Sequence, residues 1–190
     1  MGGGYLLAAL KCREKLGVEV NPAARNEAAA QGVKVVSTTD EVPGAWADVV
    51  VSNSALEHTE QPLLELRKLL PKMKPGGKLV FGIPHESLSW AYGPGDQNQH
   101  LYTWSPMSAG NLFSAAGFTV ERVYTIKSMW PPKYRMIHGL FGAKLFGVIC
   151  KAYRLLRVLL SPVKRIGADA QIVVIARQPI SRECSPASAD

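Results

Sequence analysis

Polar side chains gather in one short segment of the chain, and these residue types are the ones best suited to chemistry. Ser52–Ser54 follow the apolar run Val49–Val51, and Glu57 and His58 come shortly afterwards. Asn53, at the centre of the first group, offers both a hydrogen-bond donor and an acceptor. A histidine such as His58 can orient a substrate or accept a proton near neutral pH, although a structural role in the loop is the alternative.

A strand, helix and strand pattern over residues 47–84 would position these side chains. Val49–Val51 is short, apolar and β-branched, which predicts a buried strand. Leucines recur at helical spacing over residues 63–70, Pro75–Gly77 ends that helix, and Lys78–Ile83 predicts a second strand. Strands joined by a helix run parallel, and ligands bind at the carboxyl ends of parallel strands. The polar segment 52–58 therefore lies where a ligand is expected.

A glycine run and an acidic residue near the start of the chain predict a second group of contacts. Gly2–Gly4 precede a helix expected over Tyr5–Leu16, and glycine lets a ligand approach a backbone whose first N–H groups are unpaired. A strand expected over Leu16–Pro22 contains Glu19, whose carboxylate can accept two hydrogen bonds from a ribose diol. The alternatives are a flexible tail for the glycines and a solvated carboxylate for Glu19.

The order of these motifs resembles a known family. The segments DVVVSNSALEH, KPGG, KLVFGIP and HLYTWSPMSAGNLFSAAGFTVERV are similar to class I S-adenosylmethionine-dependent methyltransferases of the broad small-molecule type. The resemblance covers roughly residues 2–125 and resumes at 170–178. It implies an α/β fold with a doubly wound, mainly parallel, Rossmann-like sheet. It also implies methyl transfer from S-adenosylmethionine to a small-molecule or lipid-linked acceptor.

The resemblance also implies roles for individual residues. His58 is the candidate for acid–base or orienting work, although alignment contributes most to such a transfer. The loop His85–Gln99 is a candidate substrate lid. The residues implied to contact the cofactor are Gly2, Gly4, Glu19, Asp40, Asn53 and Leu56. Those implied to line the acceptor pocket are His85, Trp90, Tyr92 and His100, with ordinary packing as the alternative for the aromatic residues.

The chain departs from the resembled family at its beginning. The family's first strand, with its acidic end and a further glycine, does not precede Gly2. That strand is normally central, so we expect a sheet with its first strand missing. Two interpretations remain: the chain starts late within the glycine-rich motif, or it is a degenerate remnant that is inactive as truncated.

The remaining elements follow from hydrophobic pattern and capping residues. We expect one methyltransferase-like domain over residues 1–178, with an insertion at 127–169, and a disordered tail over 179–190. Helices are predicted over Pro22–Gln31 and Ser105–Ala116. Strands are predicted over Val33–Thr38, Phe118–Tyr124 and Ala170–Ala176.

The insertion before the last strand concentrates the positive charge of the chain. It holds nine basic residues and one acidic residue, a net charge of +8, whereas the rest of the chain carries −1 of the total of +7. Met136–Leu160 is apolar, and Lys144, Lys151 and Arg154 fall roughly on one face, which predicts a basic amphipathic helix. Such a helix suits an anionic membrane surface. A cap over the acceptor site and a partner interface are the alternatives.

Several classes of protein fit the sequence poorly. No uncharged apolar run reaches the length of a membrane span, and the cations are too diluted by aliphatic residues for a nucleic-acid interface. The four histidines and three cysteines show no metal-ligand spacing, so we expect no metal. A G-x-S-x-G hydrolase motif is absent.

Location and alternative functions rest on weaker signals. Three widely spaced cysteines favour a reducing compartment, so we expect a cytoplasmic protein. The basic helix adds the expectation of a peripheral position on the inner face of the membrane. A nicotinamide-dependent oxidoreductase is the alternative enzyme, because it also uses a glycine turn and a strand-end acid. A non-catalytic membrane-associated methyltransferase remnant is the alternative from another class.

Overall fold

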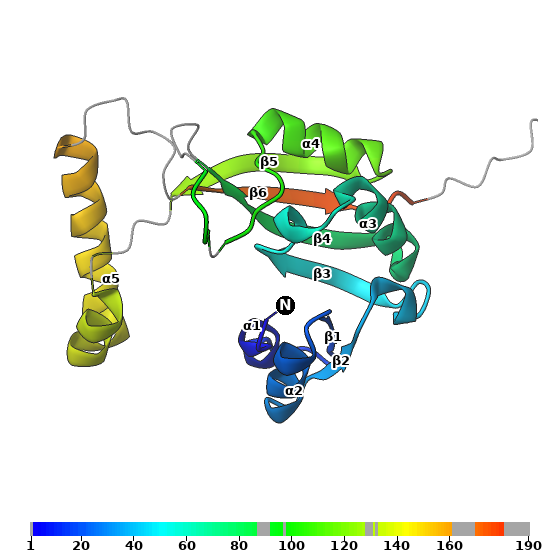
Figure 1. Cartoon of the computed structure of the whole chain (residues 1–190), viewed down its shortest axis with the longest axis horizontal. Coiled ribbons are helices and arrows are strands. Elements are labelled where there is room, and N and C mark those ends of the chain that lie inside the picture. Colours follow the sequence, from blue (N-terminus) through cyan, green and yellow to red (C-terminus); the bar gives the residue numbers. More distant parts are fainter. Residues whose placement is uncertain are drawn as a thin grey trace, which may run out of the picture.

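The structure is a computed structural model that describes residues 2–86, 92–96, 98–127, 131, 133–160 and 170–180. It contains two sheets with flanking helices (Figure 1). The strands are β1 (Leu16–Val18), β2 (Lys34–Val36), β3 (Ala47–Asn53), β4 (Met73–His85), β5 (Thr119–Lys127) and β6 (Ala170–Arg177). The α-helices are α1 (Tyr5–Ala9), α2 (Pro22–Ala30), α3 (Pro62–Leu69), α4 (Pro106–Ala115) and α5 (Tyr134–Leu160). Three 3-10 turns are η1 (Thr39–Glu41), η2 (Leu56–His58) and η3 (Leu70–Lys72).

The larger sheet confirms the predicted α/β, Rossmann-like fold. Its strand order is β3-β4-β6-β5, while β1 and β2 form a separate parallel pair. Strands β3 and β4 run parallel, and β6 runs antiparallel to both of its neighbours, so the sheet is mixed. Among the described strands, β3 pairs with β4 alone, and its other edge faces the part of the molecule that holds β1 and β2.

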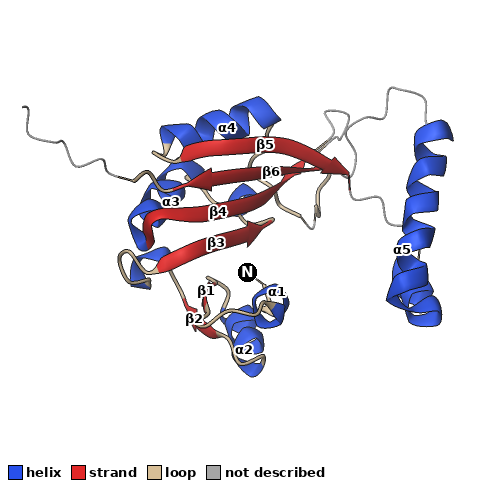
Figure 2. Ribbon diagram, turned by 180° about the vertical axis from the view of Figure 1, so that it is seen from behind, coloured by secondary structure: helices blue, strands red, loops and turns tan. Residues whose placement is uncertain are grey.

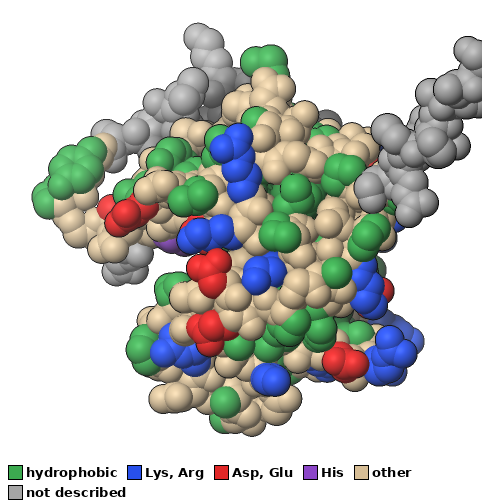
Figure 3. Space-filling model, turned by 90° about the vertical axis from the view of Figure 1, so that its right-hand side faces the viewer, with side chains coloured by type: hydrophobic (Ala, Val, Ile, Leu, Met, Phe, Trp, Pro, Cys, Tyr) green, Lys and Arg blue, Asp and Glu red, His purple; other side chains and the backbone are tan. Residues whose placement is uncertain are grey.

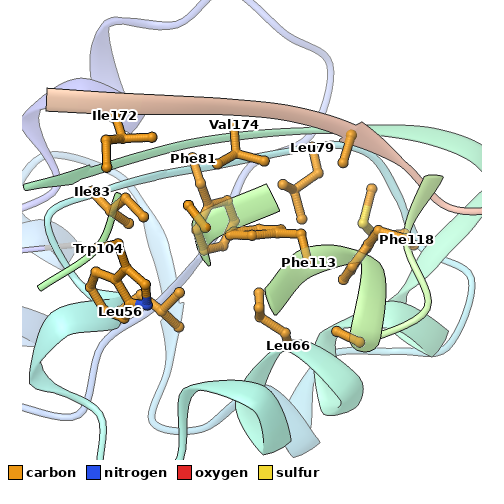
Figure 4. Packing of buried hydrophobic residues seen from close by; sticks show 14 of the residues in the cluster. Leu56, Leu66, Leu79, Phe81, Ile83, Trp104, Phe113, Phe118, Ile172 and Val174 are labelled. Carbon is orange, nitrogen blue, oxygen red and sulfur yellow. The ribbon is translucent and has the colours of Figure 1, made fainter. Parts of the chain in front are cut away.

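The hydrophobic core lies between this sheet and the two helices α3 and α4. Figure 4 shows Phe113 of α4 among side chains of β4 and β6, with Leu66 of α3 beside it. Phe113 is fully buried, and its ring stands edge-on to Phe81 at 5.2 Å between centroids. Phe118 closes the cluster at 6.2 Å from Phe113. The core therefore ties β4, the strand that leads into the candidate site, to α4.

Capping residues set the bounds of α4 as the sequence predicted. Ser108 donates its backbone N–H to the Ser105 hydroxyl at 3.1 Å, and Pro106 occupies the first turn. Gly117 follows the helix with φ of +102°, a conformation that favours glycine.

Two local predictions are wrong. The first helix ends at Ala9 rather than Leu16, and Leu10 is already extended. Tyr5 and Leu6 are 62% and 57% exposed, so little burial supports a longer helix. Val49 and Val51 were expected to be buried, but they are 59% and 41% exposed. Figure 2 shows why, since α3 and α4 both lie behind the strands and leave the facing side of the sheet uncovered.

The turn Pro75–Gly77 also behaves differently from the prediction. It lies within β4, as an interruption of the strand register, rather than before the strand. Ala47 pairs with Met73, whereas Val49 pairs with Lys78, so the chain loops out between the two pairs. Gly76 adopts φ of +76° in this loop.

Helix α5 lies within the predicted insertion, but it is not one straight helix. Gly142 has non-helical angles (φ 66°, ψ 172°), so two helical pieces meet there. Figures 1 and 2 show α5 standing apart from the sheet and from α3 and α4, which is not the arrangement of a cap over the strand ends. No helix in the described part of the chain is long and apolar enough to cross a membrane. Of the predicted tail, residues 181–190 lie outside the described residues.

Charged side chains on the body of the protein are mixed in sign. Figure 3 shows Lys and Arg interspersed with Asp and Glu on the side that faces right in Figure 1. Two of the ion pairs are Lys74–Asp48 at 2.8 Å and Lys68–Asp40 at 3.9 Å. This side therefore lacks the single-sign surface typical of nucleic-acid binding.

Candidate functional site

The carboxylate of Glu19 lies at the end of β1 and meets the glycine run. The backbone N–H of Gly2 donates to Glu19 Oε2 at 2.7 Å, and that of Asn21 donates to Oε1 at 3.0 Å. Burial raises the pKa of Glu19, but hydrogen bonds to the carboxylate, those from the Asn21 and Gly2 backbone N–H groups among them, hold the pKa below its ordinary value. Glu19 is therefore an ionised acceptor beside Gly2, and the structure brings these two predicted cofactor residues together.

Gly4 meets a packing requirement beside the same carboxylate. It is buried with φ of +78°, and a Cβ there would stand 2.7 Å from the Cβ of Ala28 in α2. A side chain at Gly4 would push the glycine run away from α2. Gly2 is exposed and has open space around it, so it is the glycine of the pair that a ligand can approach.

The carboxyl ends of β3 and β4 meet the amino end of β6 in a second polar group. Gln171 of β6 donates through Nε2 to Asn53 Oδ1, and to the Ser54 hydroxyl at 3.4 Å. The chain turns at Ser54, whose φ is +51° and whose N–H donates to Gly82 at 2.8 Å. The position of the Asn53 side chain requires glycine at position 82, because a Cβ there would lie 2.8 Å from Asn53 Oδ1. The Asn53 oxygen is thus oriented by a strand far away in the sequence.

Glu57 is a buried acid directly after this polar group. Its side chain is fully buried within η2, and neither carboxylate oxygen has a hydrogen-bond partner among the residues that the structure describes. Burial raises the pKa of Glu57 above its ordinary value. An acid in this state is costly to the fold, so it is a candidate for function.

His58 and His100 stand beside Glu57. Their rings meet edge-on at 4.8 Å between centroids, and His100 Nε2 lies 3.9 Å from Glu57 Oε1. His100 Nδ1 contacts Glu86 Oε1, at the end of β4. The loop that carries His100 is fixed over η2 by two bonds, from Leu101 N–H to the Glu57 carbonyl at 2.9 Å and from the Tyr102 hydroxyl to Glu60 at 2.8 Å.

Several other residues that the sequence predicted for the site lie in positions less suited to contact a ligand. Asp40 lies in η1, where its backbone carbonyl accepts a hydrogen bond from Lys72 at 3.0 Å. Because Lys72 directly precedes β4, Asp40 lies near the start of that strand and away from the strand ends that carry Asn53. Leu56 is 4% exposed and belongs to the core. His85 donates through Nδ1 to the Trp104 carbonyl at 2.8 Å, and Tyr92 is 93% exposed. Trp90 lies outside the described residues.

Sequence comparison identifies the family. The family described as "Methyltransferase domain" matches residues 2–123, which is more than half of the chain. The chain belongs to this family. It is a class I, S-adenosylmethionine-dependent methyltransferase, and the family resemblance seen in the sequence is confirmed. No curated protein sequence matches the chain.

Solved structures of other methyltransferases share the fold. A possible histamine N-methyltransferase from Thermotoga maritima is 21% identical, with a TM-score of 0.58 over 93% of this chain and 78% of that one. A Mesorhizobium loti methyltransferase is 18% identical, with a TM-score of 0.52 over 86% and 80%. Phosphoethanolamine N-methyltransferase 2 of Haemonchus contortus, solved with S-adenosylmethionine, is 14% identical, with a TM-score of 0.51 over 86% and 43%.

Three residues of the candidate site were not assigned to it by the sequence analysis. Gln171 lies more than one hundred positions from Asn53, so no local pattern could pair them. Glu86 falls in a loop with no periodic signal, and its partner His100 lies 14 residues further along the chain, so no local pattern links the two. Glu57 did carry a signal, because an acid beside a histidine follows a predicted strand end.

Proposed function

We propose that this methyltransferase moves a methyl group from S-adenosylmethionine to a small-molecule or lipid-linked acceptor. The observation that carries the proposal is the meeting of the Glu19 carboxylate with the Gly2 backbone at the end of β1. An ionised hydrogen-bond acceptor beside exposed glycine backbone suits the ribose of S-adenosylmethionine and the methionine group attached to that ribose. The acceptor class is taken from the sequence resemblance.

The residues present fit the cofactor at two places. Glu19 would accept hydrogen bonds from the ribose hydroxyls, and Asn53, oriented by Gln171, would hold the methionine end. When bound, S-adenosylmethionine supplies an electrophilic methyl group on a sulfonium sulfur. Gly4 keeps the glycine run in place through its packing on α2. We leave Asp40 and Leu56 out of this cofactor site, because η1 and the core hold them elsewhere.

The acceptor would lie on the side of Glu57, His58 and His100. These residues would align the acceptor atom with the methyl group and exclude water, which are the contributions that matter most in a methyl transfer. His58 is exposed and could take up the proton that an oxygen or nitrogen acceptor releases. His85 is fixed through Trp104 and would contribute to the wall of the pocket.

A calorimetric titration with S-adenosylhomocysteine tests this proposal. We expect the unaltered chain to bind, and Glu19→Gln to weaken binding about 10- to 100-fold, because charge-assisted hydrogen bonds to the ribose are lost. Glu14→Gln is the matched control, since this exposed acid precedes β1 and should leave binding unchanged.

The outcomes of that titration separate the interpretations. No binding by any form would leave the non-catalytic remnant as the better description. Equal binding by Glu19→Gln and the unaltered chain would remove Glu19 from the site. The family match already favours a methyltransferase over the nicotinamide-dependent oxidoreductase.

We also propose that α5 contacts an anionic membrane surface. Supporting this, α5 exposes large apolar side chains together with Lys144 and Lys151. The exposed apolar residues include Met136, Leu140, Phe141, Leu145, Val148, Leu155 and Leu156. Apolar groups can enter the lipid interface while lysine side chains extend to the headgroups.

Sedimentation with lipid vesicles tests the membrane contact. We expect binding to vesicles that contain phosphatidylglycerol, and roughly tenfold or greater weakening by the double change Lys144→Glu and Lys151→Glu. A double change of the exposed Lys11→Glu and Lys34→Glu is the control of equal charge. Equal binding by the two variants would contradict a specific role for α5.

A further inference from the structure

We propose that Glu57, His58 and His100 form a binding site for one divalent transition-metal ion of the zinc class. Each residue offers one ligand atom, and these three atoms all lie within 4.8 Å of one another. The sequence predicted no metal, because the histidines have no local ligand spacing. The fold supplies the spacing by returning His100 to η2.

The distance between Glu57 and His100 suits one ion after a small side-chain rotation. Ligand atoms about 2.1 Å from a tetrahedral ion stand roughly 3.4 Å apart. His100 Nε2 and Glu57 Oε1 are 3.9 Å apart, so a shift of a few tenths of an ångström brings the pair to that separation. His58 is exposed, so an ion can enter from solvent.

The burial of Glu57 is an independent sign of a missing cation. Its side chain has no exposed surface, and neither oxygen has a hydrogen-bond partner among the described residues. A carboxylate in such surroundings needs a cation or a donor to offset its loss of water. A metal ion held jointly with two histidines supplies that charge where no described side chain donates.

Glu86 prepares His100 to be a ligand. It contacts Nδ1 of His100, and an ionised carboxylate can only accept, so the proton resides on Nδ1. The lone pair is then on Nε2, which is the nitrogen that faces Glu57. Histidine ligands of metals are commonly held by a carboxylate in this way.

The donor set indicates which ion binds. Two imidazole nitrogens and one carboxylate favour zinc, cobalt or ferrous iron over magnesium and calcium, which prefer all-oxygen sites. Three protein ligands leave a coordination position open. An oxygen or nitrogen atom of the acceptor could occupy that position, and His58 would then act as a metal ligand rather than as a proton acceptor. Metal binding itself does not depend on the proposed methyl transfer.

Titration of the metal-stripped full chain with Co²⁺ alone tests the site, read by the visible absorption of the bound ion. We expect Glu57→Gln and His100→Gln each to weaken binding by at least about 100-fold, and Glu86→Gln by about 10-fold, as for a residue that positions a ligand. His138→Gln, in α5, is the control and should leave binding unchanged. Zn²⁺ should displace the cobalt and abolish the absorption.

Two results would overturn the metal site. One is the absence of cobalt binding by the unaltered chain up to about 1 mM. The other is unchanged binding by Glu57→Gln and His100→Gln when circular dichroism shows both variants folded. Because no cofactor is present, failure here is distinct from failure to bind S-adenosylhomocysteine.

Discussion

Replacing Glu57 by methionine should stabilise the metal-stripped protein at pH 8 by about 3 kcal/mol. The side chain is buried without hydrogen-bond partners among the described residues, so the fold bears the cost of removing a carboxylate from water. Methionine fills a similar volume without that cost. The backbone bond from Leu101 to the Glu57 carbonyl is unaffected by the change.

The pH dependence of this gain follows from the direction of the pKa shift. Burial raises the pKa of Glu57 in the folded state above its unfolded value, so the folded protein binds the proton more tightly. The unaltered chain therefore loses stability as the pH rises from the unfolded pKa through the raised folded pKa. The methionine variant lacks this loss, so its advantage should grow with pH across that window and shrink below it.

Urea unfolding at several pH values, in the presence of a chelator, measures the effect. Glu60→Met is the matched control, because this exposed acid lies in the same segment and should change stability by less than about 0.5 kcal/mol. Excess Zn²⁺ should narrow the difference, since only the unaltered chain gains a ligand. A methionine variant less stable than the parent at pH 8 would show that Glu57 is satisfied in the fold.

Replacing Phe113 by alanine should lower the free energy of unfolding by about 3–5 kcal/mol. The ring is fully buried between α4 and the sheet, against Phe81 and Phe118. The loss combines buried apolar area, aromatic contacts and the cavity left behind. Chemical unfolding at fixed pH measures it.

Met107→Ala is the control within the same helix, because Met107 is 75% exposed and should cost little. At a temperature where the Phe113→Ala variant stays folded, cofactor affinity should be unchanged, since the ring lies in the core and not at the strand ends. A loss below about 1 kcal/mol would mean that α4 does not pack on the sheet in solution.

Elements with strong local signals could be predicted from the sequence. The leucine spacing of α3 and the Ser105 cap of α4 predicted both helices close to their observed bounds. The apolar run of β6 likewise predicted a buried strand. In each case local preference and burial act in the same direction, so local reasoning is sufficient.

Elements whose state depends on distant partners could not be predicted. Val49 and Val51 have the pattern of a buried strand, but exposure depends on which helices cover each face of the sheet. The first helix stops early because little of its surface is buried, which no local pattern reveals.

The candidate site shows the same division. Glu19 and Gly2 could be predicted because a glycine turn and a strand-end acid are local signals, and the structure joins them. The contacts of Gln171 with Asn53 and of His100 with Glu86 join residues that are 118 and 14 positions apart, so they depend on the tertiary fold. The proposed metal site likewise depends on the fold placing His100 beside Glu57 and His58. The spacing of the histidines in the sequence therefore gave no indication of it.

Hydrogen exchange with and without S-adenosylhomocysteine tests most directly whether the glycine run, Glu19 and Asn53 form one cofactor site. We expect ligand-dependent protection in peptides that contain Gly2–Gly4, Glu19–Asn21 and Ser52–Ser54, with α4 and α5 unchanged. Protection confined to other segments, or binding that protects none of these three, would contradict it.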